Sequence, residues 1–138
     1  VDILLTPMTK WSIFEKLETS AELNDPFKGH LAIFTCQIGL LHLWRSWGIE
    51  PNAVVGQSVG DVAAAYASGA ICLADAVRII YHRSRILADK IGGKMMVVSN
   101  MNVDIVEDIC VEEEGNVNIA VYNSPDSCTL SGNSDAIE

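Results

Sequence analysis

Hydrophobic residues in the first part of the chain recur at the spacing of amphipathic helices. Residues 11–18 predict a short helix, and residues 24–30 predict a loop because asparagine, aspartate, proline and glycine gather there. A long apolar helix is expected over residues 31–47, ending at Gly48. Its apolar side chains reach most of the way round, so we expect it to be buried on several sides.

A short apolar run at residues 53–56 interrupts this helical pattern. The run contains β-branched residues and predicts a buried strand of a parallel sheet. The alanine-rich residues 60–68 predict a helix packed on that strand, ending at Gly69. A longer helix is predicted over residues 73–91, and a double glycine follows it.

After the double glycine the pattern changes to short strands. Strands are predicted at residues 94–99, 117–122 and 128–131, a helix at 103–112, and a further helix from about Asp135. This β-α-β-β-α order is the beginning of a ferredoxin-like unit without its last strand. We therefore predict an α/β chain with a subdomain boundary at Gly92-Gly93.

Composition narrows the class of protein. The 138 residues suffice for one ordinary core, and a chain that starts at Val1 and stops within a helical turn predicts a fragment. The net charge of −9 gives no basic stripe for nucleic acid, and no run is long enough to span a bilayer. The four scattered cysteines form no C-x-x-C pair or metal-ligand cluster, which favours a reducing cytosol and no metal.

The candidate nucleophile is Ser58, in the G-x-S-x-G motif of residues 56–60. The motif lies between a predicted strand and a predicted helix, which is the context of a nucleophile elbow. Glycine on each side of the serine relieves crowding on such a sharp turn. The N–H of Val59, at the start of the helix, can donate to the oxyanion of a tetrahedral intermediate. The alternative is a glycine-rich turn with an incidental serine.

Arg83 is the second candidate, because it falls on the apolar stripe of the helix predicted at 73–91. At 100° per residue, Arg78, His82, Arg85 and Asp89 face solvent, whereas Leu73, Ala76, Ile80 and Leu87 face the core. A guanidinium among apolar residues requires an anion. That anion is either a core carboxylate such as Asp61 or the carboxylate of a substrate held by a bidentate clamp.

These residues resemble the malonyl-CoA:acyl-carrier-protein acyltransferases, especially the acyltransferase domains of type I polyketide synthases and animal-type fatty-acid synthases. The similarity covers most of the chain: residues 11–17, 37–60, 61–70, 75–85, 118–125 and 130–132. It implies that residues 1–91 form part of an α/β-hydrolase-like parallel-sheet core. Residues 92–138 would then be part of a ferredoxin-like small subdomain.

The resemblance also implies a role for each matched residue. Ser58 would attack an acyl-CoA thioester and pass the acyl group to a phosphopantetheine thiol on an acyl-carrier protein. Arg83 would hold the carboxylate of a malonyl-type unit, and Gln57 and Asn123 would line the site. The implied partners are carrier protein, malonyl-CoA or a similar acyl-CoA, and neighbouring synthase domains. No tightly bound cofactor, nucleic acid or membrane is expected, and the location would be cytoplasmic.

The chain departs from the family pattern at several positions. Gln57 stands where the family usually has histidine, Asp61 where it has glutamate, and Cys72 where serine or threonine often caps the long helix. The family's catalytic histidine and its second oxyanion donor belong to segments beyond Glu138 and before Val1. Three histidines are present, placed on an outer helix face (His82), on a buried helix (His42) and in a loop (His30). None suits the base, so this fragment alone is expected to be inactive.

Two other functions share some of these residues. A serine esterase or thioesterase of the α/β-hydrolase class has the same elbow but uses water as acceptor, and it gives no reason for Arg83. A non-catalytic acyltransferase-like domain that only docks carrier protein would tolerate changes such as Gln57 and Asp61. The sequence does not choose between malonyl and methylmalonyl units.

Overall fold

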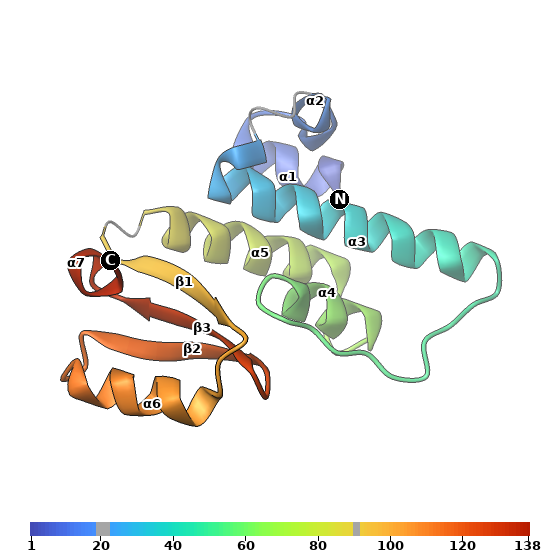
Figure 1. The fold of residues 1–138 in the computed structure, drawn as a ribbon. Helices are drawn as coiled ribbons and strands as arrows, with labels where there is room; N and C mark the ends of the chain where they lie inside the picture. Colours follow the sequence, from blue (N-terminus) through green and yellow to red (C-terminus); the bar gives the residue numbers. More distant parts are fainter. Residues whose placement is uncertain (19–22, 90–91) are drawn as a thin grey trace. The chain divides into compact units, whose positions relative to one another are not determined.

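The computed structural model describes residues 1–18, 23–89 and 92–138, and the chain divides into two compact units, Val1–Lys90 and Ile91–Glu138. The first unit is helical (Figure 1). Its helices are α1 (Asp2–Thr9), α2 (Ile13–Leu17), α3 (Pro26–Ser46), α4 (Gly60–Ala67) and α5 (Leu73–Ala88). None of the helices in these described ranges is both long and apolar enough to cross a membrane.

The core of the first unit lies where α3 and α5 pack side by side, with α1, α2 and α4 against them (Figure 1). Full burial of a large apolar side chain contributes about 1.5–3 kcal/mol to the stability of the fold. The largest of the fully buried side chains come from four of the helices: Leu5, Ile13, Leu31, Phe34, Val77 and Ile80. The expectation that this helix is buried on several sides is wrong for the described chain, because one face of α3 is exposed along its length at Ile33, Leu40, Leu43 and Trp44.

Helix α3 begins earlier than predicted, and most of the loop expected at 24–30 is helical. Pro26 occupies the first turn, where its missing N–H costs nothing. The Asp25 side chain caps the helix by accepting from the Lys28 backbone N–H at 2.9 Å. The residues that suggested a loop are therefore helix-starting residues, and His30 lies on α3 instead of in a loop.

The strand predicted at residues 53–56 does not form. Val55 is 94% exposed and Val54 39% exposed, so the run is not buried as expected. A strand exists only when its backbone pairs with a neighbour. The described part of the first unit contains no other extended segment with which it pairs.

The two helices on either side of the candidate site form close to their predicted bounds. Helix α4 ends before Gly69, which has a left-handed φ of +78°. Helix α5 starts at Leu73 as predicted and ends at Ala88; the end predicted at residue 91 lies outside the described residues. The residues of α5 predicted to face the core are buried or partly buried, and those predicted to face solvent are exposed. The exception is Leu87, which is predicted to face the core and is 45% exposed.

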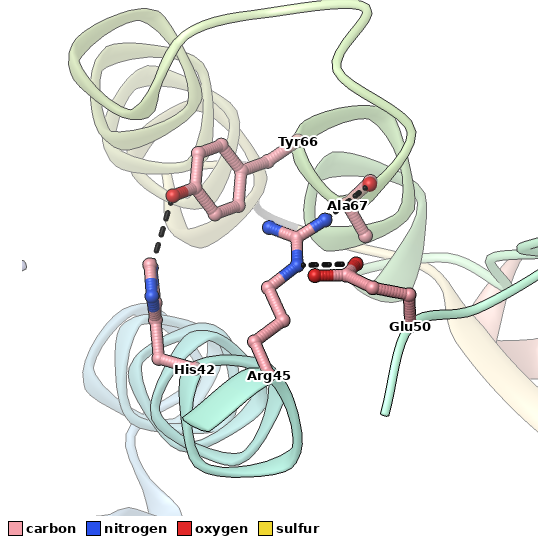
Figure 2. Close-up of polar contacts among 5 residues, drawn as sticks. All are labelled: His42, Arg45, Glu50, Tyr66 and Ala67. Atoms are coloured by element: carbon pink, nitrogen blue, oxygen red, sulfur yellow. Dashed lines mark hydrogen bonds and ion pairs between the residues drawn. The ribbon is translucent and has the colours of Figure 1, made fainter. Parts of the chain in front are cut away.

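A cluster of polar contacts ties the end of α3 to the end of α4 (Figure 2). Arg45 donates through Nη2 to the carbonyl of Ala67 at 3.0 Å and through Nε to Glu50 at 2.9 Å. One turn earlier, His42 Nε2 and the Tyr66 hydroxyl are 2.9 Å apart. We name these contacts the α3–α4 clamp; they fix α4, whose other end leads to Ser58.

The second unit is a three-stranded antiparallel sheet with helix α6 on one face (Figure 1). It consists of β1 (Lys94–Ser99), α6 (Val103–Glu112), β2 (Val117–Ser124), β3 (Ser127–Gly132) and α7 (Ser134–Ile137), in the predicted order. The strand order is β1-β3-β2, with Met96 opposite Leu130 and Val98 opposite Cys128. The buried residues come from α6, β2, β3 and α7: Val103, Val106, Val117, Cys128, Leu130 and Ile137.

Candidate functional site

Ser58 lies on a sharp turn between the extended residues 53–57 and helix α4. Its φ is +54°, in the left-handed region that non-glycine residues rarely adopt. Such a backbone costs on the order of 1–3 kcal/mol and persists only where the surroundings enforce it. The backbone bonds Gly60 N–H to Gln57 O (2.9 Å) and Asp61 N–H to Ser58 O (3.3 Å) close the turn. The serine side chain is exposed.

The two glycines of the motif have different reasons to be there. A Cβ at Gly56 would lie 2.4 Å from Cα of Asp61, so only glycine lets the chain approach the start of α4. A Cβ at Gly60 would meet only Nε2 of Gln37 at 3.5 Å, an ordinary contact. The expectation that glycine relieves crowding on both sides of Ser58 therefore applies to Gly56 alone within the described residues.

The guanidinium of Arg83 reaches Ser58 from helix α5. Its Nη2 donates to Oγ of Ser58 at 3.2 Å. Its Nη1 is buried and has no hydrogen-bond partner among the described residues. No ion pair joins Arg83 to Asp61 or to another carboxylate in those ranges, so the core ion pair considered above does not form. The partly buried Arg83 cation therefore has no anionic side chain beside it in the described part of the chain.

The backbone N–H of Val59 belongs to the residue immediately before α4. In the described parts of the chain it donates to no backbone or side-chain acceptor, while the N–H groups of the next two residues close the turn. A free N–H beside an exposed hydroxyl, at the positive end of a helix dipole, favours a nearby negative charge. The role of the Val59 N–H as an oxyanion donor stays a prediction.

The two predicted lining residues lie in different units. Gln57 is exposed and borders a groove of about 500 Å³ that also involves Gln37, Ala63 and the extended segment. Asn123 is on β2 in the second unit, where its amide Nδ2 donates to Oγ1 of Thr129 at 3.0 Å. Their roles at the site stay predictions.

The three histidines are not placed as the sequence suggested, except His82, which is exposed on α5. His42 is exposed and contacts Tyr66, so it is not a core histidine. His30 lies on α3, and its Nδ1 is buried without a partner in the described ranges. Burial lowers the pKa of His30, and the nearby Arg83 cation lowers it further. Helical periodicity continued back to Pro26 would have placed His30 on the face of Phe34.

The cysteines and acidic residues form no cluster with metal-ligand geometry within the ranges described. All four cysteines are free thiols. Cys72 is the N-cap of α5 but makes no capping bond; its thiol donates instead to Asp75 at 3.3 Å.

Comparison with known proteins identifies the family to which this chain belongs. Residues 1–138 match the acyl transferase domain family, so the chain belongs to that family, as the residues predicted. The highly reducing polyketide synthase dmxL2 of Cryptosporiopsis sp. (strain 8999) is 36% identical over 137 residues, which cover 93% of this chain and 6% of the synthase. The chain is thus similar to the acyltransferase part of polyketide synthases and spans a small share of their length.

Solved structures agree with this assignment. A loading acyltransferase from the avermectin modular polyketide synthase has a TM-score of 0.87 and 30% identity, covering 99% of this chain and 45% of that chain. MCAT from Streptococcus pneumoniae has a TM-score of 0.86 and 27% identity, and the match covers 99% of this chain and 47% of that chain. The two units described above therefore have the fold of part of an acyltransferase domain.

Proposed function

We propose that this chain is part of an acyltransferase domain that moves a malonyl-type acyl group from coenzyme A to an acyl-carrier protein. The observation that carries the proposal is the pairing of Ser58, on a strained turn, with Arg83, a partly buried cation 3.2 Å away that has no carboxylate partner among the described residues. An esterase elbow explains the serine but offers no use for such an arginine.

Ser58 supplies the nucleophile in this proposal. Its Oγ attacks the thioester carbonyl, the C–S bond breaks, coenzyme A leaves as its thiol, and the acyl group stays on Ser58 as an ester. The N–H of Val59 stabilises the oxyanion. The phosphopantetheine thiol of the carrier protein then attacks the ester and frees Ser58. No histidine is hydrogen-bonded to Ser58 in the described ranges, so the base comes from outside these residues and the fragment alone is inactive.

Arg83 selects the acyl group. A guanidinium binds a carboxylate through two parallel hydrogen bonds, which fixes both its position and its plane. An acetyl group leaves the partly buried Arg83 cation unpaired, and that cost discriminates against acetyl units. The hydrogen bond from Nη2 to Oγ of Ser58 supports this role, because the cation then lies beside the atom that would carry the acyl ester.

The finer architecture is also part of the proposal. Residues 1–91 form part of an α/β-hydrolase-like core in which 53–56 becomes a central strand of a parallel sheet. The high exposure of Val55 supports this, because a β-branched residue in an extended segment favours burial in a sheet. Residues 92–138 form part of a ferredoxin-like small subdomain, supported by the β1-β3-β2 order. Carrier protein and neighbouring synthase domains are the partners, in the cytoplasm.

Loading of the complete domain with radiolabelled acyl-CoA tests both residues. Ser58→Ala should abolish covalent labelling from malonyl-CoA, since the ester oxygen is gone; label retained on the variant protein excludes Ser58 as nucleophile. Arg83→Ala should cut malonyl loading by roughly a hundredfold while sparing acetyl loading, because a charged hydrogen-bonded contact contributes about 1.5–3 kcal/mol. Release of free malonate without transfer to carrier protein would support the hydrolase instead.

A further inference from the structure

A groove of about 650 Å³ follows helix α5 in the first unit and adjoins the candidate site. Its walls are mostly apolar, and the residues that line it come from α5 and from the segment just before it: Ile71, Asp75, Arg78, Ile79, His82 and Arg83. Arg83 belongs to both places, because it lines this groove and donates through Nη2 to Oγ of Ser58. A ligand in the groove would therefore reach the candidate nucleophile.

The size and lining of the groove suit an extended small molecule. Ligand pockets typically enclose about 300–1,000 Å³ and combine apolar walls with a few polar groups. From Asp75 to Arg83 the groove follows α5 for about 12 Å, at 1.5 Å per residue. Ile79 is 44% exposed and offers apolar surface along this length, and the side chain of Arg78 is 72% exposed. The groove thus fits a long, partly apolar chain that carries a negative group.

Helix α5 concentrates positive charge in an acidic chain. The chain has a net charge of −9 and nine lysine and arginine residues, of which three lie on α5: Arg78, Arg83 and Arg85. Such a local cluster attracts anions whatever the net charge of the whole chain. Asp75 lies 3.8 Å from Arg78 in a long, exposed ion pair, which contributes little, and Asp75 also accepts from the Cys72 thiol. Arg78 can therefore exchange this partner for a phosphate.

We infer that the groove along α5 holds the phosphopantetheine arm of the thioester substrate, with the phosphate at Arg78. The arm is a chain of methylene and amide groups with sulfur at one end and a phosphate at the other. Its apolar part matches Ile71 and Ile79, and a guanidinium binds a phosphate through parallel hydrogen bonds. The sulfur end would lie toward Arg83 and Ser58. The inference rests on the proposed function, because it requires a thioester that reacts with Ser58.

One groove can serve both half-reactions, because coenzyme A and the carrier protein carry the same arm. Ser58 first takes the acyl group from the arm of coenzyme A and then gives it to the thiol of the carrier's arm. The phosphate is the charged group that both arms share, whereas the adenosine part belongs to coenzyme A alone. Arg78 should therefore act on both substrates and on malonyl and acetyl thioesters alike, unlike Arg83, which selects the acyl group.

The test measures kcat/KM of the complete acyltransferase domain with three thioesters. They are malonyl-CoA, malonyl-phosphopantetheine, which lacks the adenosine part, and malonyl-pantetheine, which also lacks the phosphate. Transfer to holo-carrier protein and loading from acetyl-CoA are measured in parallel. Arg78→Gln removes the charge, and Arg78→Lys keeps it as a point charge. Arg85→Gln is the matched control, because Arg85 is exposed on the same helix and does not line the groove.

We expect Arg78→Gln to lower kcat/KM by roughly tenfold for malonyl-CoA, malonyl-phosphopantetheine, acetyl-CoA and holo-carrier protein, because a hydrogen bond to a charged group is lost. With malonyl-pantetheine the change should stay below about twofold, since that substrate has no phosphate to lose. Arg78→Lys should recover most of the activity, and Arg85→Gln should behave as the wild type.

Several results would overturn the inference. An equal loss with malonyl-pantetheine would mean that Arg78 is structural, and an equal loss in Arg85→Gln would mean that the effect is one of general charge. A loss for malonyl-CoA alone would place Arg78 at the nucleotide, and a loss for the carrier protein alone would place it on the docking surface. No loss with any substrate would exclude the groove. None of these results affects labelling of Ser58 or the selectivity of Arg83, so the groove can fail while the proposed function stands; label retained on Ser58→Ala would remove both.

Discussion

At the scale of single residues, the site depends on a backbone held in an unfavourable conformation. Ser58 keeps its φ of +54° because the turn is closed on both sides by backbone hydrogen bonds and by the close approach of Gly56 to Asp61. The strain is therefore localised in a very short segment. Any change that pushes Gly56 and Asp61 apart should move the serine oxygen away from Arg83.

Gly56→Ala tests this dependence. The added methyl group would overlap Cα of Asp61 at 2.4 Å, and backbone atoms cannot give way as a flexible side chain does. We expect a loss of about 3 kcal/mol in unfolding free energy and loss of malonyl loading, measured by urea denaturation and acyl-enzyme labelling. Gly60→Ala is the matched control. Its methyl group would lie 3.5 Å from Nε2 of Gln37, an ordinary contact, so it should change the unfolding free energy by less than about 1 kcal/mol. Similar losses for both variants would contradict the assignment.

The residues of the site differ in how far the sequence predicts them. Ser58 follows from a motif between two elements, and Arg83 from its place on the apolar stripe of a helix; the structure brings their side chains together at 3.2 Å. His30 does not follow from the sequence in the same way, because its segment is typical of a loop and its burial depends on the packing of α3 against its neighbours. Burial and missing partners are properties of the folded chain and leave no local pattern.

At the scale of elements, the helices and the strands of the second unit follow from periodicity because their patterns are local. The start of α3 differs from the prediction because Asp25 and Pro26 suit both a turn and a helix N-terminus, and only the cap bond to Lys28 decides between them. The extended run at 53–56 shows the opposite limit. Its β-branched residues favour a strand, but a strand also requires a pairing partner, and no local pattern supplies one.

The α3–α4 clamp allows a prediction about elements. Arg45→Ala removes a charged hydrogen bond to the Ala67 carbonyl at the end of α4, and it should lower the unfolding free energy of the domain by about 1–2 kcal/mol. Glu50→Gln weakens only the ion pair with Arg45. Because the Glu50 side chain is 64% exposed, this change should lower the unfolding free energy by less than about 0.5 kcal/mol. Urea denaturation of both variants gives the comparison. An equal loss in the two would mean that the ion pair, and not the cap on α4, stabilises this contact.

At the scale of the whole molecule, each unit has its own core, while the first unit leaves apolar surface uncovered. Val55 is the most exposed of the large hydrophobic residues in the described ranges, at 94%. Residues 53–56 also leave their backbone N–H and C=O groups unpaired there. An unpaired, apolar, extended segment promotes association between chains.

Val55→Lys should therefore act in opposite directions in two settings. In the 138-residue chain it places a charge on an open segment and should reduce aggregation, measured by light scattering. In the complete domain, where we propose that this segment is a central strand, the same lysine becomes buried and should cost several kcal/mol of stability. Val55→Thr, which keeps the branched shape, is the control. Stabilisation or neutrality of Val55→Lys in the complete domain would show that the segment stays at the surface.

The unpaired backbone at 53–56 also suggests a way to study the acyltransferase domain in separate pieces. A strand with free N–H and C=O groups can recruit another chain by β-augmentation, in which main-chain hydrogen bonds supply the affinity. The remainder of the domain, produced separately, should then reassemble with these residues by fragment complementation. Reconstituted activity would report, strand by strand, on the contacts that hold the nucleophile in place.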